Sequence, residues 1–177
     1  MAHVANLHAT KQIEASSVDE SWRIWPSDDL PARKQPLGDL FFANSVWVVS
    51  KRCADIIGKF DLGAGSLYPV QLLEDDRMTV TDTTYFCINF GNRITAILPD
   101  LSTGIRKTFN DYYRLKGVVN DDDIKLSAAA VSGPDLWIDP LLEGVLFLSD
   151  RLHAALSKAQ VLKGFGDLKR CIVAQQN

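Results

Sequence analysis

A run of apolar residues that passes through a serine into an amphipathic segment occurs twice in this chain. The second occurrence, residues 145–156, reads VLFLSDRLHAAL. Its four continuous apolar residues are typical of a strand buried on both faces, and Ser149 can cap a helix because its hydroxyl accepts from free amides of the first turn. Leu152 and Leu156 then share one helix face, and Asp150 places a negative charge where the helix dipole favours it. We therefore expect a strand that leads directly into a helix.

The first occurrence, residues 46–57, reads VWVVSKRCADII and has Ser50 in the place of Ser149. Arg52 likewise corresponds to Arg151. Two explanations stay open: any buried strand that feeds an N-capped helix has this pattern, or the chain contains an internal duplication. In both cases we expect the two strand–helix units to share a core.

The segments between and beside these units have strand-forming composition. They are residues 68–73, 84–90, 93–98, 124–126 and 136–138. Gly91-Asn92 predicts a hairpin turn between the second and third of these segments.

These elements predict an α+β fold in a single domain, with a mixed or mostly antiparallel sheet and helices that follow the first and last core strands. The domain is expected to span residues 21–177, and residues 1–20 are expected to be a loose N-terminal arm. Pro26, Pro31 and Pro36 forbid a continuous helix at the start of the domain. Trp22 and Trp25 in the same stretch either anchor it to the body or bind a partner.

Composition narrows the possible functions. The chain has 177 residues, of which 46% are hydrophobic and 23% charged, as expected for one globular core. A formal charge of −3 and the lack of a basic stripe argue against direct nucleic-acid binding. The chain has neither a signal-peptide pattern nor an apolar run of about 18 residues, so we expect a cytoplasmic location and no membrane association.

The sequence gives little support to catalysis. Three cysteines without a CxxC pair indicate reduced thiols rather than disulfides or a zinc site. His153 falls on the second helix and is expected to be a rim residue. A small hydrolase or transferase that uses Cys87 or His153 is the alternative, although no flanking motif supports it. We expect no enzyme activity and no cofactor.

Two acidic clusters are the most distinctive polar feature. They are Glu74, Asp75 and Asp76, and Asp121, Asp122 and Asp123. Three interpretations are open: a site for calcium or magnesium, solvated turns, or a negative surface for a basic partner. The residues are consecutive and lack the alternating spacing of a calcium loop, so we expect no metal.

Several short motifs occur in an order that resembles a known family. They are VWVVSKRCADII with the following Tyr68-Pro69-Val70, AILPDLS at 96–102, LWID at 136–139, and LFLSDRLHAAL followed by KGFGDL. Over about residues 40–168 this order is similar to that of the bacterial polymorphic-toxin immunity proteins of the eleventh immunity class. The resemblance implies a protein that binds and neutralises a toxin in bacterial competition, delivered through type VI secretion or a contact-dependent route. It brings no catalytic motif.

A cytoplasmic immunity protein must meet a toxin with a cytoplasmic target, and a nuclease, in particular a DNase, fits best. The basic cleft of a nuclease complements an acidic surface. We therefore predict that both acidic clusters contact the toxin, with Trp137, Trp22 or Trp25 as aromatic anchors. A non-catalytic adaptor with an unrelated partner is the remaining alternative, and the oligomeric state stays open.

Overall fold

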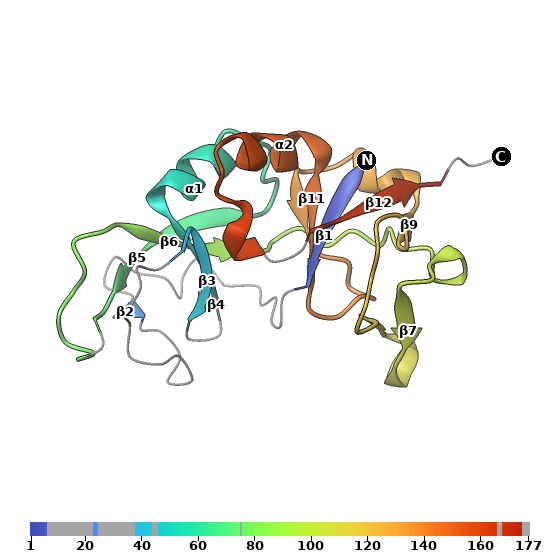
Figure 1. The fold of residues 1–177 in the computed structure, drawn as a ribbon, viewed down its shortest axis with the longest axis horizontal. Coiled ribbons are helices and arrows are strands. Elements are labelled where there is room, and N and C mark those ends of the chain that lie inside the picture. The colour runs from blue at the N-terminus through green and yellow to red at the C-terminus, as the bar shows by residue number, and fades with distance from the viewer. Residues whose placement is uncertain (7–22, 25–37, 44–45, 75, 166–167, 175–177) are drawn as a thin grey trace.

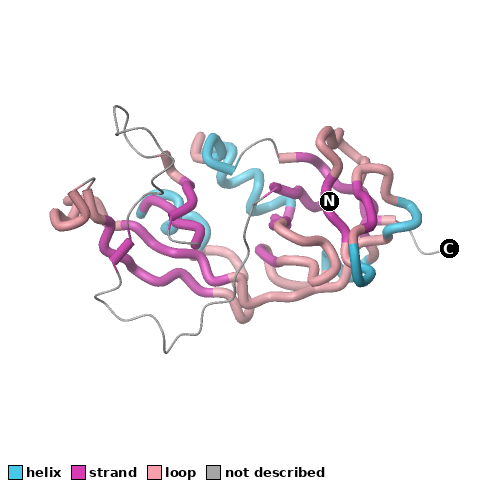
Figure 2. The backbone as a smooth tube through the Cα atoms, turned by 90° about the horizontal axis from the view of Figure 1, so that it is seen from below, coloured by secondary structure: helices cyan, strands magenta, loops and turns pink. Residues whose placement is uncertain are grey.

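The structure, a computed structural model, describes residues 1–6, 23–24, 38–43, 46–74, 76–165 and 168–174. These residues form two five-stranded sheets, a separate two-stranded hairpin and two α-helices. Figure 2 shows the strands in two groups that loops connect. The fold is α+β with mostly antiparallel strand pairs, which confirms the predicted class.

The first sheet has the order β2 (Arg23–Ile24), β5 (Ser66–Leu72), β6 (Tyr85–Asn89), β4 (Val46–Ser50) and β3 (Leu40–Ala43). The second has the order β10 (Leu136–Trp137), β11 (Val145–Ser149), β1 (Ala2–Asn6), β12 (Lys169–Val173) and β9 (Lys125–Leu126). Helix α1 (Lys51–Ile57) follows β4, and α2 (Asp150–Lys158) follows β11. We call the first sheet with α1 the first lobe, and the second sheet with α2 the second lobe. The hairpin of β7 (Ile105–Lys107) and β8 (Tyr113–Leu115) lies between the lobes in the chain.

Both predicted strand–helix units are confirmed, and each helix begins at the predicted serine. The Ser50 hydroxyl accepts from the Cys53 amide at 3.2 Å, and the Ser149 hydroxyl accepts from the Leu152 amide at 3.1 Å. Each serine thus satisfies one amide that the first helical turn leaves without a backbone partner.

Each cap serine is in turn held by an aspartate that directly precedes an edge strand. The Ser50 amide donates to the Asp39 carbonyl at 3.0 Å, and its hydroxyl donates to the Asp39 carboxylate at 2.6 Å. Ser149 repeats both bonds with Asp135: its amide donates to the carbonyl at 2.9 Å, and its hydroxyl donates to the carboxylate. The two units therefore share an aspartate, a hairpin, a cap serine and a helix in the same order.

The two sheets also repeat one pattern of strand directions. In each sheet we count from the edge strand that pairs with the strand leading into the helix. The first three strand pairs are antiparallel, and the fourth pair is parallel. In the first lobe these strands are β3, β4, β6, β5 and β2; in the second they are β10, β11, β1, β12 and β9. The chain order matches as well, except that β1, from the N-terminal end, takes the place that β6 has in the first lobe.

The register of the strands agrees with this correspondence. Ser50 lies opposite Tyr85, which lies opposite Val70; Ser149 lies opposite Ala2, which lies opposite Cys171. In both lobes the parallel pairing then involves the next two residues of the fourth strand. Of the two explanations for the repeated sequence pattern, these matches support internal duplication.

The two lobes share a core, as predicted. Strand β11 is buried on both faces: Leu146 and Leu148 point into one apolar cluster, and Val145 and Phe147 into another. The first of these clusters also holds side chains of β4, α1 and α2. Figure 1 shows the two helices on the same side of the molecule, α1 over the first sheet and α2 beside it.

The N-terminal residues differ from the predicted loose arm of residues 1–20. Ala2–Asn6 form β1, which lies in the middle of the second sheet, antiparallel to β11 and β12. Five residues without apolar alternation carry no strand signal of their own, and pairing with two strands far along the chain provides it. Residues 7–20, and both Trp22 and Trp25, lie outside the described residues.

The predicted hairpin turn at Gly91-Asn92 was wrong. Residues 93–98 make isolated bridges to segments of the second lobe instead of a strand beside β6. The backbone at Gly91 passes so close to Ala64 that a Cβ would lie 1.9 Å from its carbonyl oxygen. The side-chain amide of Asn92 donates to the Leu136 carbonyl at 2.9 Å. This pair therefore connects the lobes.

Asp135 is 1% exposed, and replacement by asparagine is expected to lower the free energy of unfolding by about 2 kcal/mol, because the hydrogen bonds from Ser149, Arg151 and Asp61 lose a buried, charged acceptor. Urea denaturation measures the difference. Asp100→Asn, at an exposed position, is the control and should change stability by less than about 0.5 kcal/mol. Equal losses in both variants would contradict the assignment.

The loss of unfolding free energy in Asp135→Asn is expected to depend on pH. Burial raises the pKa of the Asp135 carboxyl, but hydrogen bonds from Arg151, Ser149 and the Asp61 amide outweigh it, and the pKa lies below its ordinary value. The carboxylate therefore stabilises the fold above the unfolded pKa, and this contribution is lost as pH falls through the lower folded pKa. The deficit of Asp135→Asn relative to the wild type should accordingly shrink below about pH 4.

A central β1 predicts slow hydrogen exchange at the N-terminal end. Its amides donate across the sheet to β11 or β12, so their protection should approach that of β11 itself. Exchange of the β1 amides within seconds, with β11 protected, would show that the strand is not part of the sheet in solution.

Candidate functional site

The first acidic cluster lies in a loop that extends β5 and β6 beyond their sheet, residues 73–84, here called the acidic loop. Leu73 and Val80 form an antiparallel bridge at its base, and the Glu74 amide donates to the Thr79 carbonyl at 2.7 Å. The Asp76 carboxylate accepts from the amides of Met78 and Thr79, both at 2.8 Å. The described residues of the loop therefore form a hydrogen-bonded turn; Asp75 lies outside the described residues.

The acidic loop combines negative charge with exposed apolar surface. Hydrogen bonds from the Thr79 side chain and from the Thr79 and Met78 amides lower the pKa of Asp76, so its carboxylate is charged at neutral pH. Glu74 and Asp82 are exposed. Met78 is 78% exposed and Val80 is 41% exposed. Apolar side chains of this kind, rimmed by charge, are typical of protein interaction surfaces.

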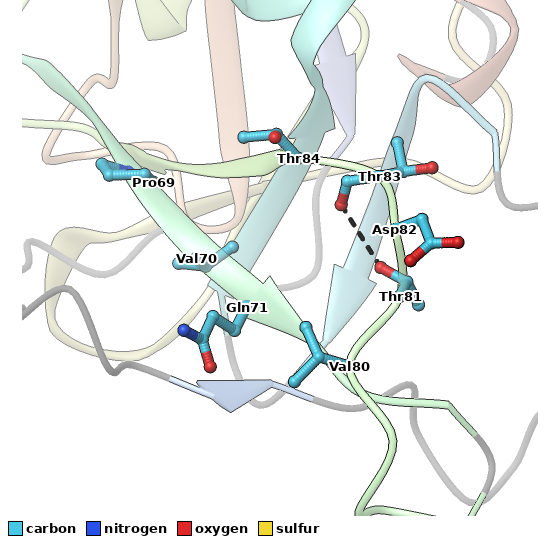
Figure 3. Close-up of a pocket in the computed structure, with 8 residues that line it drawn as sticks. All are labelled: Pro69, Val70, Gln71, Val80, Thr81, Asp82, Thr83 and Thr84. Carbon is cyan, nitrogen blue, oxygen red and sulfur yellow. Dashed lines mark hydrogen bonds between the residues drawn. The ribbon is translucent and has the colours of Figure 1, made fainter.

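An open pocket of about 310 Å³ lies beside the acidic loop. It is lined by Pro69, Val70 and Gln71 of β5 and by residues 80–84. Figure 3 shows β5 on one side and the 80–84 segment on the other, with the Thr81 hydroxyl donating to the Thr83 carbonyl. Asp82 lies at this pocket, which is large enough to accept a side chain from a partner.

The second acidic cluster holds the chain together locally. Asp122 forms an ion pair with Arg170 of β12, and Asp121 accepts from the Arg170 amide at 2.8 Å. Asp123 accepts from the Asn120 amide at 2.8 Å. The hydrogen bond from Arg170 lowers the pKa of Asp122. This cluster therefore fixes the turn before β9 against β12.

The structure does not bring the two acidic clusters together. The acidic loop lies at the free end of the first lobe, whereas β9 and β12, beside the second cluster, lie at the far end of the second lobe (Figure 1). They do not form one continuous surface.

Trp137, predicted as an aromatic anchor, is 0% exposed. It lies in β10 and stacks on Phe147, with ring centroids 5.5 Å apart. A side chain without exposed surface offers a partner no contact area, so Trp137 belongs to the core of the second lobe. The sequence gives little sign of this burial, because the short apolar segment 136–138 that contains Trp137 is flanked by Asp135 and Asp139.

The candidate catalytic residues are placed as parts of the fold. Cys87 lies on β6 and is 0% exposed, and burial raises its pKa to about 11. His153 lies half-buried on α2. Among the described residues, no three His, Cys, Asp or Glu side chains gather as a metal ion would require. The arrangement therefore offers a surface for binding rather than an activated nucleophile.

Sequence reasoning missed the apolar part of this surface. The sequence pattern assigns no role to Met78, although a methionine within a charged loop is itself a sign of an exposed contact residue. It assigns none to Phe109 of the β7–β8 hairpin either. The Asn110-Asp111 pair, which suits a tight turn, was the available signal there.

Comparison with protein families places the chain. Residues 11–166 match the immunity protein family Imm11, and because the match covers most of the 177 residues, the chain belongs to this family. The resemblance drawn from the sequence motifs is thereby confirmed. Immunity proteins neutralise a toxin by binding it, and they typically do so without catalysis. A search of curated proteins gave no match. Within the described residues, none of the helices combines the length and apolar character needed to span a membrane.

The buried thiols give a test of the catalytic alternative. Burial also raises the pKa of Cys53 and Cys171 to about 12, so little thiolate forms in the native protein. At pH 8, native protein should react with iodoacetamide about a hundredfold more slowly than protein unfolded in urea. Mass spectrometry of the labelled peptides measures this rate, and rapid native labelling of Cys87 would favour a nucleophilic role.

Proposed function

We propose that this immunity protein neutralises a cognate nuclease toxin, a DNase, in the cytoplasm, and that the acidic loop contacts the toxin. The pair would act in bacterial competition, with the toxin delivered through type VI secretion or a related system. The observation that carries the proposal is the ordered acidic loop, which presents Met78 between Glu74 and Asp82 beside an open pocket.

Electrostatics supports this choice of partner and surface. The loop carries four acidic residues and one basic residue, and the chain as a whole has a charge of −3. A nuclease must bind a polyanion and therefore has a basic cleft. Opposite charges raise the association rate, which matters because the toxin has to be captured before it cleaves its target.

The exposed apolar side chains of the acidic loop are expected to slow dissociation of the complex, which charge alone does not do. Rim charges mainly steer association, whereas apolar contacts in the centre of an interface slow dissociation. Met78 adapts its shape to a partner because its side chain is flexible and polarizable. The pocket lined by Val80 and Asp82 of the acidic loop can receive a basic side chain of the toxin.

Neutralising the acidic loop should weaken toxin binding. The variant carries Glu74→Gln, Asp75→Asn and Asp76→Asn, which keep the size of each side chain and an acceptor at position 76. Binding is measured against the toxin domain encoded beside this chain's gene, at several salt concentrations. Affinity at low salt should fall about tenfold, mainly through slower association, and the salt dependence should decrease.

The second acidic cluster provides a matched control. Asp121→Asn, Asp122→Asn and Asp123→Asn make the same change in net charge at the other end of the molecule. This variant should lower the Tm, because the contacts to Arg170 and Asn120 weaken, and leave toxin affinity close to that of the wild type. Equal losses of affinity in both variants, or none in either, would sink the assignment to the loop.

The nature of the toxin is tested in cells. Expression of the adjacent gene should degrade chromosomal DNA, and co-expression of this protein should prevent it. Killing with intact nucleic acid would overturn the nuclease part of the proposal, and killing without rescue would overturn the immunity pair itself.

A further inference from the structure

The β7–β8 hairpin is an addition to the repeated architecture. It lies between β6 and β9 in the chain and has no counterpart among the described residues of either lobe. Both sheets are complete without it, and although Ile105 at its base belongs to the core cluster of the second lobe, the projecting tip is not part of either sheet or core. Surface segments that a rigid scaffold positions are where binding residues tend to lie.

The base of the hairpin is firmly attached to the body. The Tyr113 amide donates to the Leu141 carbonyl at 2.8 Å, and the Glu143 amide donates to the Tyr113 carbonyl at 3.0 Å. Arg114 forms an ion pair with Glu143 at 2.6 Å, and Ile105 is buried. The hairpin is therefore a fixed projection.

The tip of the hairpin is equally well defined. The Thr108 amide donates to the Tyr112 carbonyl at 2.7 Å, and Lys107 pairs with Asp111 at 2.6 Å. Asn110 and Asp111 have φ values of 58° and 61°, in the left-handed region that these two residue types tolerate best. This tight turn presents the neighbouring Phe109 to solvent.

Phe109 is 91% exposed, more than any other large apolar side chain of the described residues. An aromatic ring on a rigid turn is an efficient anchor, because burying it removes much apolar surface from water and orders few bonds. Tyr112, 41% exposed, adds a second ring at the same tip.

The charge of the hairpin is opposite to that of the acidic loop. Residues 104–117 carry four basic side chains, Arg106, Lys107, Arg114 and Lys116, and one acidic side chain, Asp111. In Figure 1 the hairpin and the acidic loop both extend away from the side that carries α1 and α2, at the two ends of the molecule. A single partner that approaches the side opposite the helices meets a negative projection at one end and a positive, aromatic projection at the other.

We infer that the β7–β8 hairpin is a second contact for the cognate toxin, with Phe109 entering an apolar pocket that is bordered by carboxylates. The inference rests on the proposed function, since the partner is the toxin. It adds an orientation: the basic region of the toxin faces the acidic loop, and an acidic region faces Arg106 and Lys107. Two contacts of opposite charge admit one orientation and reject the reverse.

The test measures binding of the toxin domain encoded beside this chain's gene, made inactive by substitution in its active site. Phe109→Ala should weaken affinity at least tenfold, mainly through faster dissociation, and Arg106→Glu should weaken it through slower association. Leu101→Ala, at a leucine that is 57% exposed and lies outside the hairpin, is the matched control and should stay within twofold of the wild type. Since Phe109 is exposed, the Tm should not change, so loss of folding does not confuse the result.

A variant that combines Phe109→Ala with the neutralised acidic loop tests whether the two contacts act independently. The projections are far apart, so their effects should multiply in the combined variant. Wild-type affinity in Phe109→Ala, with weakened binding in the acidic-loop variant, would overturn this inference and leave the proposed function standing. Failure of the wild-type protein to bind the toxin would overturn both.

Size-exclusion chromatography of the protein without toxin tests whether Phe109 contacts a second copy of this chain instead. A wild-type dimer that Phe109→Ala splits, with toxin affinity unchanged, would assign the hairpin to self-association and overturn the inference. Equal elution volumes of the wild type and Phe109→Ala, together with the loss of toxin affinity in Phe109→Ala, would support the inference.

Discussion

The buried carboxylate of Asp135 joins the start of α2 to both lobes of the molecule. It accepts from the Ser149 hydroxyl, from two nitrogens of Arg151, and from the amide of Asp61, which follows α1 in the chain. The first two partners fix where α2 begins, and the third fixes the first lobe against the second. A buried carboxylate is stable only when such donors surround it, so the position of each partner depends on the others.

The direction of the helices follows from this arrangement and from its counterpart at Asp39. Each serine is held through its amide and its hydroxyl, so α1 and α2 leave their sheets at defined angles and contact each other. Leu152 and Leu156 then meet Cys53 and Ile57 in one cluster. The two halves differ at the arginine: Arg151 pairs with Asp135, whereas Arg52 donates to the carbonyl of Ala159 at the end of α2. The duplicated residue thus ties the lobes together.

Local patterns in the sequence were sufficient for the elements whose signals are local. The apolar runs, the cap serines and the acidic first turn of α2 all lie within a few residues of one another, and both units form as predicted. Strand β1 was missed because its stability comes from β11 and β12, which five residues cannot reveal. Gly91 was misread because a glycine required for close approach to Ala64 looks the same in sequence as one required for a turn.

The candidate site was predicted in the same partial way. Consecutive carboxylates are visible in any sequence, but whether they face solvent or hold an arginine depends on contacts such as Asp122 with Arg170, which come from distant parts of the chain. Burial of Trp137 likewise depends on Phe147 in the neighbouring strand. Exposure of Met78 and Phe109 is a property of where the loop and the hairpin end, and it becomes visible once the lobes are in place.

The position of β1 has a consequence for how the protein is made. Ribosomes synthesise Ala2 long before its partners, because Ser149 and Cys171 lie about 150 and 170 residues further along the chain. At bacterial elongation rates this delay is on the order of ten seconds. The first lobe can close during synthesis, whereas the second lobe has to wait until its last strand leaves the ribosome. Completion of the shared core therefore waits for β12, and until β12 has emerged the first strand must be kept from incorrect pairing.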